Sequence, residues 1–314
     1  MRHHAAIIFL ATIALQANAE SPEACAEIDE STQRLACYDS IFRETIAEEP
    51  AAEEESALEQ RLAMEMHEQH RWFSITPHKP NYFLPVTYNA NSDFSDYGEF
   101  GENFSDVEVK FQISLKALFW EGLWLDSSIW GAYTQQAYWQ VYADSEASAP
   151  FRETNHQPEL IWAIPMDFEL FGWQALRTNL AFNHQSNGQS DPLSRSWNRL
   201  TAEIQLGRGD FELSAKTWVR IDDPENDNNP NIEDYMGRIQ LGAIYRHGDH
   251  VFDAWFINNL SSDNRSGIEV NWAFPLFKHV GGFVQIYSGY GENLIDMENY
   301  NNRIGVGIAL TEWL

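Results

Sequence analysis

The sequence alternates apolar and polar side chains over long stretches, and this alternation limits most strongly the folds open to the chain. In DVEVKFQISLKA, residues 106–117, the odd-numbered side chains from Val107 to Leu115 are apolar and the even-numbered ones from Glu108 to Lys116 are polar. Successive side chains of a β-strand point to opposite faces. The segment therefore predicts a strand with one apolar face, and residues 199–206 and 304–310 repeat the pattern.

Turn-forming residues separate these segments, as in DDPENDNNP (222–230) and SSDNRSG (261–267), and we count roughly twelve candidate strands. The chain has 12 Trp, 12 Tyr and 19 Phe, an aromatic content typical of strand-rich proteins. No run of eighteen apolar residues occurs. Together with the export signal described in the next paragraph, these long, two-sided, aromatic strands favour an all-β fold, a transmembrane antiparallel β-barrel of about twelve strands. A soluble β-sandwich is the alternative.

The amino terminus has the composition of an export signal. Arg2 precedes the apolar run AAIIFLATIAL, and QANA at residues 16–19 provides small residues for cleavage before Glu20. A membrane anchor is the alternative, but the apolar run is shorter than the roughly 20 residues that span a bilayer. Residues 1–19 are therefore predicted to be a signal peptide.

Residues 20–76 differ in composition from the rest of the chain. They contain both cysteines, Cys25 and Cys37, whose even number in an exported protein favours a disulfide over two free thiols. No histidine lies near the two cysteines at the spacing of metal ligands, which argues against a metal site there. Residues 44–70 are rich in Ala and Glu and predict a short helical or disordered acidic arm. The net charge of −27 argues against nucleic acid as a partner, and the barrel is expected over residues 77–314.

Polar residues interrupt the apolar face of two neighbouring strands in NHQSNGQSDPLSRSWNRL, residues 183–200. His184 and Ser186 have even residue numbers, like the apolar Leu180 and Phe182, and so point to the same face of their strand. Asn198 shares a face with Leu200 for the same reason. All three polar groups would therefore face lipid. Exposing polar groups to lipid is unfavourable unless they form hydrogen bonds with one another or take part in catalysis. His184 can act as the base that takes the Ser186 proton, and Asn198 can orient the imidazole. A hydrophilic rim where the strands leave the membrane is the alternative.

These motifs resemble the outer membrane phospholipase A family. The resemblance rests on NHQSNG, SDPLSRSWNRL, PFRETN (150–155) and SGYGENLID (288–296), and covers residues 81–314. It implies a twelve-stranded outer-membrane barrel that hydrolyses acyl esters of phospholipids and lysophospholipids as a calcium-bound homodimer. It places the nucleophile at Ser186, the base at His184 and the orienting amide at Asn198.

The resemblance also implies an oxyanion site and calcium ligands. The oxyanion donors fall on the backbone N–H groups of Ser186 and Gly188, although Gly188 also suits an ordinary turn. The calcium ligands fall on Ser148, Gln189 and Ser194, where plain exposed polar residues are the alternative. A further calcium position falls at Asp227 or Asn228, and Gln135 corresponds to a glutamine that supports the site by hydrogen bonding.

We therefore expect an A1/A2 phospholipase and lysophospholipase of the cell outer membrane, with membrane phospholipids as substrate, Ca²⁺ as cofactor and a homodimer as the active state. A non-enzymatic barrel is the alternative. A passive porin would have a wide polar lumen and idle rim serines. In a structural anchor, the acidic amino-terminal segment would instead bind the partner.

Overall fold

The structure is a computed structural model that describes residues 22–46, 55–69, 75–144, 148–221, 227, 229–277 and 280–311. The predicted signal peptide, residues 1–19, lies outside the described residues. The chain divides into two compact units, residues 1–54 and 55–314. Residues 55–69, which the sequence analysis placed with the acidic segment, thus belong to the same unit as the strands.

The first unit contains two helices joined by a disulfide. Helix α1 spans Pro22–Ala26 and helix α2 spans Ser31–Ile46. Cys25 and Cys37 are bonded to each other, and the Cys25 side chain is buried. Arg34 of α2 donates a hydrogen bond to the Ile28 carbonyl between the helices at 2.8 Å. The disulfide and this bond hold α1 against α2.

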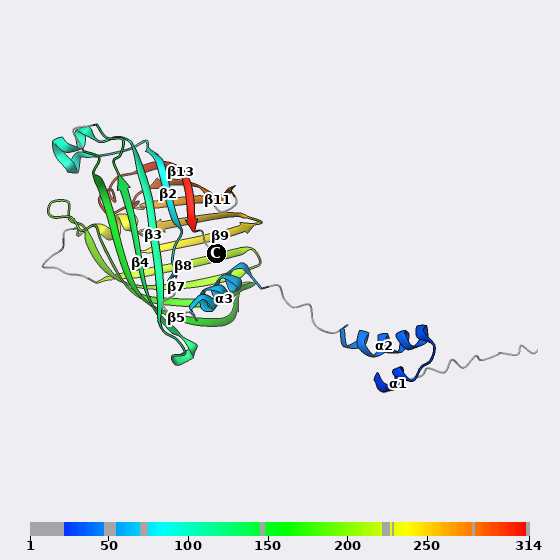
Figure 1. The fold of residues 1–314 in the computed structure, drawn as a ribbon. Coiled ribbons are helices and arrows are strands. Elements are labelled where there is room, and N and C mark those ends of the chain that lie inside the picture. Colours follow the sequence, from blue (N-terminus) through cyan, green and yellow to red (C-terminus); the bar gives the residue numbers. More distant parts are fainter. Residues whose placement is uncertain are drawn as a thin grey trace, which may run out of the picture. The chain divides into compact units, whose positions relative to one another are not determined.

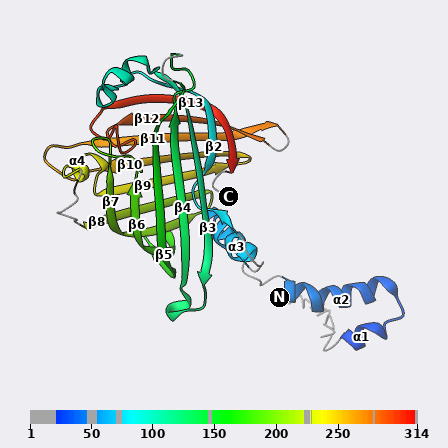
Figure 2. The same ribbon diagram turned by 60° about the vertical axis from the view of Figure 1, so that its left-hand side comes forward.

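Twelve antiparallel strands of the second unit form a closed barrel (Figures 1 and 2). The sheet runs in chain order from β2 to β13, and β13 pairs with β2, so no open edge remains in it. The two-residue strand β1 (Thr76–Pro77) adds to the end of β3. This confirms the predicted fold class. The barrel strands are β2 Asn81–Asn89, β3 Val107–Trp120, β4 Ser128–Trp139, β5 Phe151–Leu170, β6 Trp173–Ser186, β7 Ser196–Arg208, β8 Phe211–Ile221, β9 Ile239–His247, β10 His250–Asn258, β11 Ser266–Phe277, β12 Val280–Gly289 and β13 Asn301–Thr311.

The connections differ between the two ends of the barrel. At one end, two residues each join β5 to β6, β7 to β8 and β9 to β10. At the other end the connections are longer and carry η1 (Ser95–Asn103) and α4 (Ile232–Met236). Outer-membrane barrels place short turns in the periplasm and long loops outside the cell. The β6–β7 connection, with the candidate site, belongs to the long-loop end.

The apolar face of each strand points outward. In β3, Ile113 and Leu115 are 43% and 39% exposed, whereas Glu108, Lys110 and Lys116 are buried. A water-soluble protein would have the opposite arrangement, because buried charges are costly and apolar side chains gain by leaving water. The outer wall therefore suits a lipid bilayer, and the alternative of a soluble sandwich is excluded.

Ion pairs hold the buried charges inside the barrel. Near the long-loop end, Glu108 pairs with Arg152 at 2.9 Å and with Arg303 at 2.8 Å. Glu292 pairs with the same Arg303 at 2.8 Å and with Lys110 at 3.2 Å. Each of these five buried charges thus has at least one opposite charge, which offsets the cost of removing it from water. The network also joins β3, β5 and β13, next-but-one neighbours in the sheet, on the inside of the barrel.

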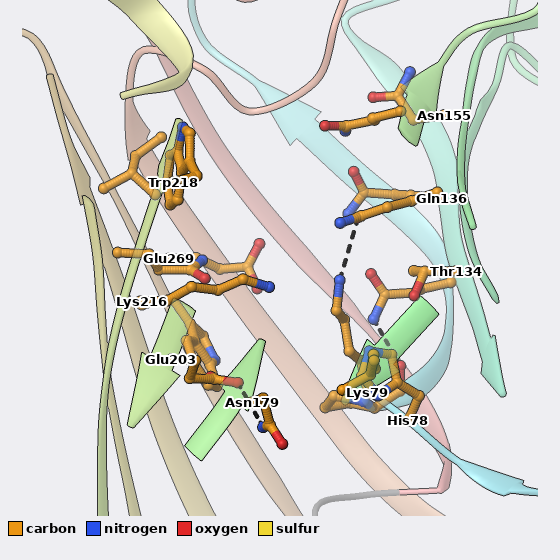
Figure 3. A pocket seen from close by; sticks show the side chains of 18 of the residues that line it. His78, Lys79, Thr134, Gln136, Asn155, Asn179, Glu203, Lys216, Trp218 and Glu269 are labelled. Atoms are coloured by element: carbon orange, nitrogen blue, oxygen red, sulfur yellow. Dashed lines mark hydrogen bonds between the residues drawn. The ribbon is translucent and has the colours of Figure 1, made fainter. Parts of the chain in front are cut away.

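A cavity of about 280 Å³ remains in the lumen (Figure 3). Figure 3 shows Lys79 and Gln136 on one side of it, facing Lys216 and Glu269 on the other. The buried Glu159 carboxylate nearby accepts a hydrogen bond from His78 at 3.1 Å, and Lys79 and Lys216 lie 3.8 Å and 3.6 Å from it. Paired charges therefore surround this cavity.

Helix α3, Ala57–Gln69, binds to the inward faces of the strands at the short-turn end. Its Glu65 carboxylate lies 2.8 Å from Lys116 of β3 and 2.9 Å from Arg177 of β6. Its Arg61 forms a buried ion pair with Glu212 of β8. The Ala57 N–H donates to the Gly209 carbonyl at 2.8 Å in the β7–β8 turn. No helix in the described ranges has both the length and the apolar character to span a membrane.

Glu65→Gln should loosen α3. Burial alone would raise the pKa of the Glu65 carboxyl, but Lys116 and Arg177 beside it lower that pKa well below its usual range. Losing the charge leaves the buried Lys116 and the half-buried Arg177 facing a neutral amide, a cost of about 3 kcal/mol. We expect a lower unfolding midpoint in detergent, while Glu55→Gln, the same change at an exposed position, should leave the midpoint unchanged.

The difference between the unfolding midpoints of Glu65→Gln and Glu55→Gln should depend on pH. Because the pKa of Glu65 is lower in the folded protein, its stabilisation is complete above the usual carboxyl pKa of about 4.3 and is lost as the pH falls through the folded-state value. The two unfolding midpoints should therefore converge toward low pH. Equal midpoints for both variants at neutral pH would mean that the Glu65 ion pairs do not hold the helix.

Candidate active site

His184, Ser186 and Asn198 come together at the end of β6 and the start of β7. His184 lies directly opposite Asn198 in the strand register. Residues opposite each other in an antiparallel pair share one face. On that face Phe182 and Leu200 are 44% and 51% exposed. The three polar side chains therefore lie on the lipid-facing wall of the barrel, near its long-loop end.

A hydrogen bond of 2.8 Å joins His184 Nδ1 to Asn198 Oδ1. An amide oxygen can only accept, so the imidazole must carry its proton on Nδ1. In the neutral ring, Nε2 then has the lone pair that a general base needs. Asn198 thus fixes both the tautomer and the direction of the ring. Both side chains are half-buried.

The Ser186 side chain is half-buried on the same face, two residues after His184. Among the hydrogen bonds of the described residues, His184 forms the one to Asn198 and none to the Ser186 hydroxyl. In hydrolases without substrate, the bond between nucleophile and base is often long and shortens when substrate binds. The geometry therefore provides an oriented base beside a serine hydroxyl.

The side chain of Asn187 organises the loop that follows Ser186. Its amide nitrogen donates to the Leu193 carbonyl at 2.8 Å, and its oxygen accepts from the Arg195 N–H at 3.0 Å. A third bond, at 3.3 Å, links it to the buried Glu153 carboxylate of β5. Gly188, the next residue, has a φ of 65°, a left-handed conformation that favours glycine. The backbone around the predicted oxyanion donors is thus held from the barrel interior.

A buried layer lies behind the site on the inward faces of β6 and β7. Gln185 Oε1 accepts from Trp197 Nε1 at 3.0 Å and from Arg199 at 3.2 Å. The Arg199 guanidinium also stacks 3.9 Å from the Trp197 ring. These residues alternate with His184, Ser186 and Asn198 along the strands. Their contacts hold β6 and β7 together directly behind the outward-facing polar side chains.

His156 of β5 is a further member of this constellation, which the sequence analysis missed. It lies directly opposite Ser186 in the β5–β6 register. Its Nδ1 is 2.7 Å from the Tyr133 hydroxyl, and that hydroxyl is 3.3 Å from Gln135 Oε1. Its Nε2 lies 3.9 Å from the point that a Cβ on Gly188 would occupy.

Strand parity could have indicated His156. It follows the PFRETN motif directly and shares the parity of Leu160, an outward residue that is 51% exposed. Its distance from Ser186, however, depends on the register between β5 and β6, which contains an irregularity. Gln135, expected to support the site, reaches His156 through Tyr133.

The candidate calcium ligands lie in two connections. Gln189 and Ser194 belong to the β6–β7 connection, and Ser148 belongs to the β4–β5 connection. The Gln189 side chain donates to the Arg152 carbonyl at 3.2 Å, so the backbone carbonyl of Gln189 is the group suited to calcium.

The donor set fits calcium in type, because all three groups are oxygens, the ligand atoms that this ion prefers. None is charged. Within the described residues, no cluster of three or more His, Cys, Asp or Glu side chains could hold a metal ion. Asp227 is engaged with Arg220 at 2.6 Å, and Asn228 lies outside the described residues.

The sequence matches the family described as phospholipase A1 over residues 58–310. The phospholipase A1 of Klebsiella pneumoniae is 39% identical over 242 residues, which are 76% of this chain and 83% of that protein. This chain belongs to the phospholipase A1 family. The predicted family resemblance is confirmed.

Solved structures of the family show the same barrel. The outer membrane phospholipase A of Escherichia coli has a TM-score of 0.74 and 36% identity, covering 81% of this chain and 98% of that one. The Salmonella typhi outer membrane phospholipase, a dimer with bound calcium, has a TM-score of 0.73 and 36% identity, covering 78% and 96%. The chain is accordingly an outer-membrane β-barrel, as predicted.

Proposed function

We propose that the protein hydrolyses acyl ester bonds of phospholipids and lysophospholipids, with A1, A2 and lysophospholipase activity, through Ser186, His184 and Asn198. The observation that carries the proposal is the 2.8 Å bond between His184 Nδ1 and Asn198 Oδ1. It presents an oriented base next to a serine on the face that meets lipid. Membership in the phospholipase A1 family agrees with this chemistry.

In the proposed mechanism, Ser186 Oγ attacks the carbonyl carbon of the acyl ester while His184 Nε2 takes the hydroxyl proton. The backbone N–H groups of Ser186 and Gly188 donate to the oxyanion of the tetrahedral intermediate. The ester C–O bond then breaks, and His184 returns the proton to the departing glycerol oxygen. Water, deprotonated by His184, hydrolyses the acyl-enzyme and releases a fatty acid.

The position of the site suits a substrate that resides in the membrane. Leu180, Phe182 and Leu200 on the same face provide an apolar surface along which acyl chains can lie. The site occupies the long-loop end, which in outer-membrane barrels faces the outside of the cell. Phospholipid in the outer leaflet would therefore place its ester at the depth of Ser186.

Calcium would be held by the Gln189 carbonyl and the hydroxyls of Ser148 and Ser194. When bound, the ion supplies positive charge beside the developing oxyanion. Three neutral ligands from two connections make a weak site in one barrel. We propose that a second barrel packed against the site wall strengthens the ligand set and completes the acyl-binding cleft. The Salmonella typhi relative is a calcium-bound dimer.

The lumen argues against the rival function of a passive porin. A porin needs a wide aqueous channel, whereas this lumen is crossed by the Glu108, Glu159 and Glu292 ion pairs and binds α3 at one end. A structural anchor that acts through α1 and α2 makes no use of Ser186. Serine-directed labelling separates the hydrolase from both rivals, because only an activated hydroxyl reacts quickly.

Ser186→Ala should abolish fatty-acid release from detergent-dispersed phospholipid while the barrel still folds. We expect a loss of at least about 10,000-fold, because the reaction has lost its nucleophile. Ser196→Ala is the matched control, since Ser196 lies opposite Ser186 on the same face. The control should keep normal turnover. Comparable turnover in Ser186→Ala and the wild type would end the assignment of this site.

Asn198→Ala should reduce kcat less than His184→Ala does. The amide only orients the imidazole, whereas the imidazole transfers the proton, and in a related triad the orienting residue contributes roughly a hundred-fold less than the base. Initial rates of both variants on one phospholipid, with folding checked by heat-modifiable gel mobility, give the comparison. The reverse order of losses would contradict the proposed roles.

Calcium should raise activity and dimer fraction together. We expect fatty-acid release in dilute detergent to follow the dimer fraction measured by sedimentation across a calcium titration, and chelator to abolish both. Ser194→Ala should shift both curves to higher calcium, because it removes one oxygen ligand. Full activity from a calcium-free monomer would contradict this mode of control and leave the nucleophile assignment intact.

A further inference from the structure

A second imidazole lies beside the candidate nucleophile. His156 of β5 is directly opposite Ser186 of β6 in the strand register, and both side chains are half-buried on the outer wall. Side chains that are opposite each other in an antiparallel pair share one face and begin about 5 Å apart. A substrate whose ester reaches Ser186 therefore comes within contact range of His156.

The contacts of Tyr133 fix the tautomer of His156. The Tyr133 hydroxyl has one proton and donates it to Gln135 Oε1 at 3.3 Å. The hydroxyl oxygen lies 2.7 Å from His156 Nδ1, so in that contact the imidazole is the donor. In the neutral ring, Nδ1 then carries the proton and Nε2 carries a lone pair. The Tyr133 ring also stacks on the imidazole, with centroids 6.2 Å apart.

The Nε2 edge of the ring lies beside the loop that follows the nucleophile. Nε2 and Cδ2 are 3.9 Å and 3.8 Å from the point that a Cβ on Gly188 would occupy, and Gly188 comes two residues after Ser186. Among the described residues, no donor forms a hydrogen bond to this Nε2. His156 thus presents a hydrogen-bond acceptor next to the serine.

This acceptor limits the kind of substrate group that His156 can bind, because the group must carry a hydrogen-bond donor close to the ester. The glycerol of a diacyl phospholipid has no such donor, since two of its hydroxyls are acylated and the third is bound to phosphate. A lysophospholipid keeps one free hydroxyl, on the carbon next to the one that bears the ester. That hydroxyl therefore stays close to the carbonyl carbon that Ser186 attacks.

We propose that His156 is a specificity-determining residue that accepts a hydrogen bond at Nε2 from the free glycerol hydroxyl of a lysophospholipid, and that Tyr133 is the positioning residue that holds the required tautomer. This inference rests on the proposed function and names a substrate class of the same site. A polar group left without a partner beside lipid is unfavourable, so the contact favours the substrate that supplies the hydroxyl.

The test compares two substrates in detergent, 1-acyl-lysophosphatidylcholine and its analogue without the glycerol hydroxyl. Both carry the same ester, phosphate and choline, and choline has no N–H donor. We expect the wild type to hydrolyse the lysophospholipid with a kcat/KM about tenfold higher, the effect of one hydrogen bond. His156→Phe should lose this preference, while its kcat/KM for the analogue changes by less than about threefold.

Three further variants separate the acceptor from a structural role of the ring. His156→Gln keeps an acceptor oxygen and should retain part of the preference. Tyr133→Phe frees Nδ1, so the other tautomer becomes available and the preference should fall, with no further effect in the His156→Phe background. His250→Phe is the matched control, because His250 is another outward histidine, stacked 6.0 Å from Trp272, and it should keep the wild-type preference. Since the preference is a ratio measured on one preparation, partial misfolding of a variant does not change it.

The outcomes distinguish this inference from the proposed function. Turnover of neither substrate by the wild type, or turnover that survives Ser186→Ala, would overturn both. Equal kcat/KM of the wild type for the two substrates, or an unchanged preference in His156→Phe, would overturn the role of His156 alone. An equal loss on both substrates in His156→Phe would mean that the ring acts without the glycerol hydroxyl, which also contradicts the proposed contact.

Discussion

The bilayer is the constraint on which the rest of this structure depends. Lipid offers no hydrogen bonds, so every backbone N–H and C=O of a spanning strand must be paired within the sheet. The pairing of β13 with β2 meets that demand by closing the ring. Closure then puts one face of every strand outside and the other inside. The apolar side chains take the outside, and the charged side chains must share a narrow lumen.

The ion pairs of the lumen also position the outward site. Arg152 of β5 binds Glu108 and Asp296 inside the barrel, and its carbonyl accepts a hydrogen bond from Gln189 in the site loop. Glu153, the next residue, binds Asn187 in the same loop. The loop that bears the proposed oxyanion donors is therefore anchored to the charge network. Rigid support of this kind is what a hydrolytic site requires.

Strand parity predicted the central part of the site from sequence. Because side chains alternate with a period of two, residues 184, 186 and 198 had to share the outward face once Leu180, Phe182 and Leu200 were assigned to it. The structure adds that His184 and Asn198 are directly opposite. The roles of these residues and of the calcium ligands stay predictions, because they concern bound substrate and ions.

Other features depend on contacts between distant parts of the chain, which alternation does not reveal. The composition of residues 57–69 predicted part of an acidic arm. In the structure, Glu65 forms ion pairs with Lys116 and Arg177, which belong to strands far along the sequence. The position of His156 opposite Ser186 depends on the register between β5 and β6. The inward orientation of the charged faces was predictable, but the pairing of particular charges was not.

A neutral orienting residue suits a site on the lipid-facing wall. An aspartate in the place of Asn198 would put a full charge on that wall, and charges are expensive near hydrocarbon. An amide oxygen still accepts from His184 Nδ1 at 2.8 Å and still fixes the tautomer, without that cost in the resting protein. It also stabilises the imidazolium less once His184 has taken a proton. Neutral backbone donors from Ser186 and Gly188 toward the oxyanion would compensate for that weaker partner, because they act on the negative charge that forms at the same moment.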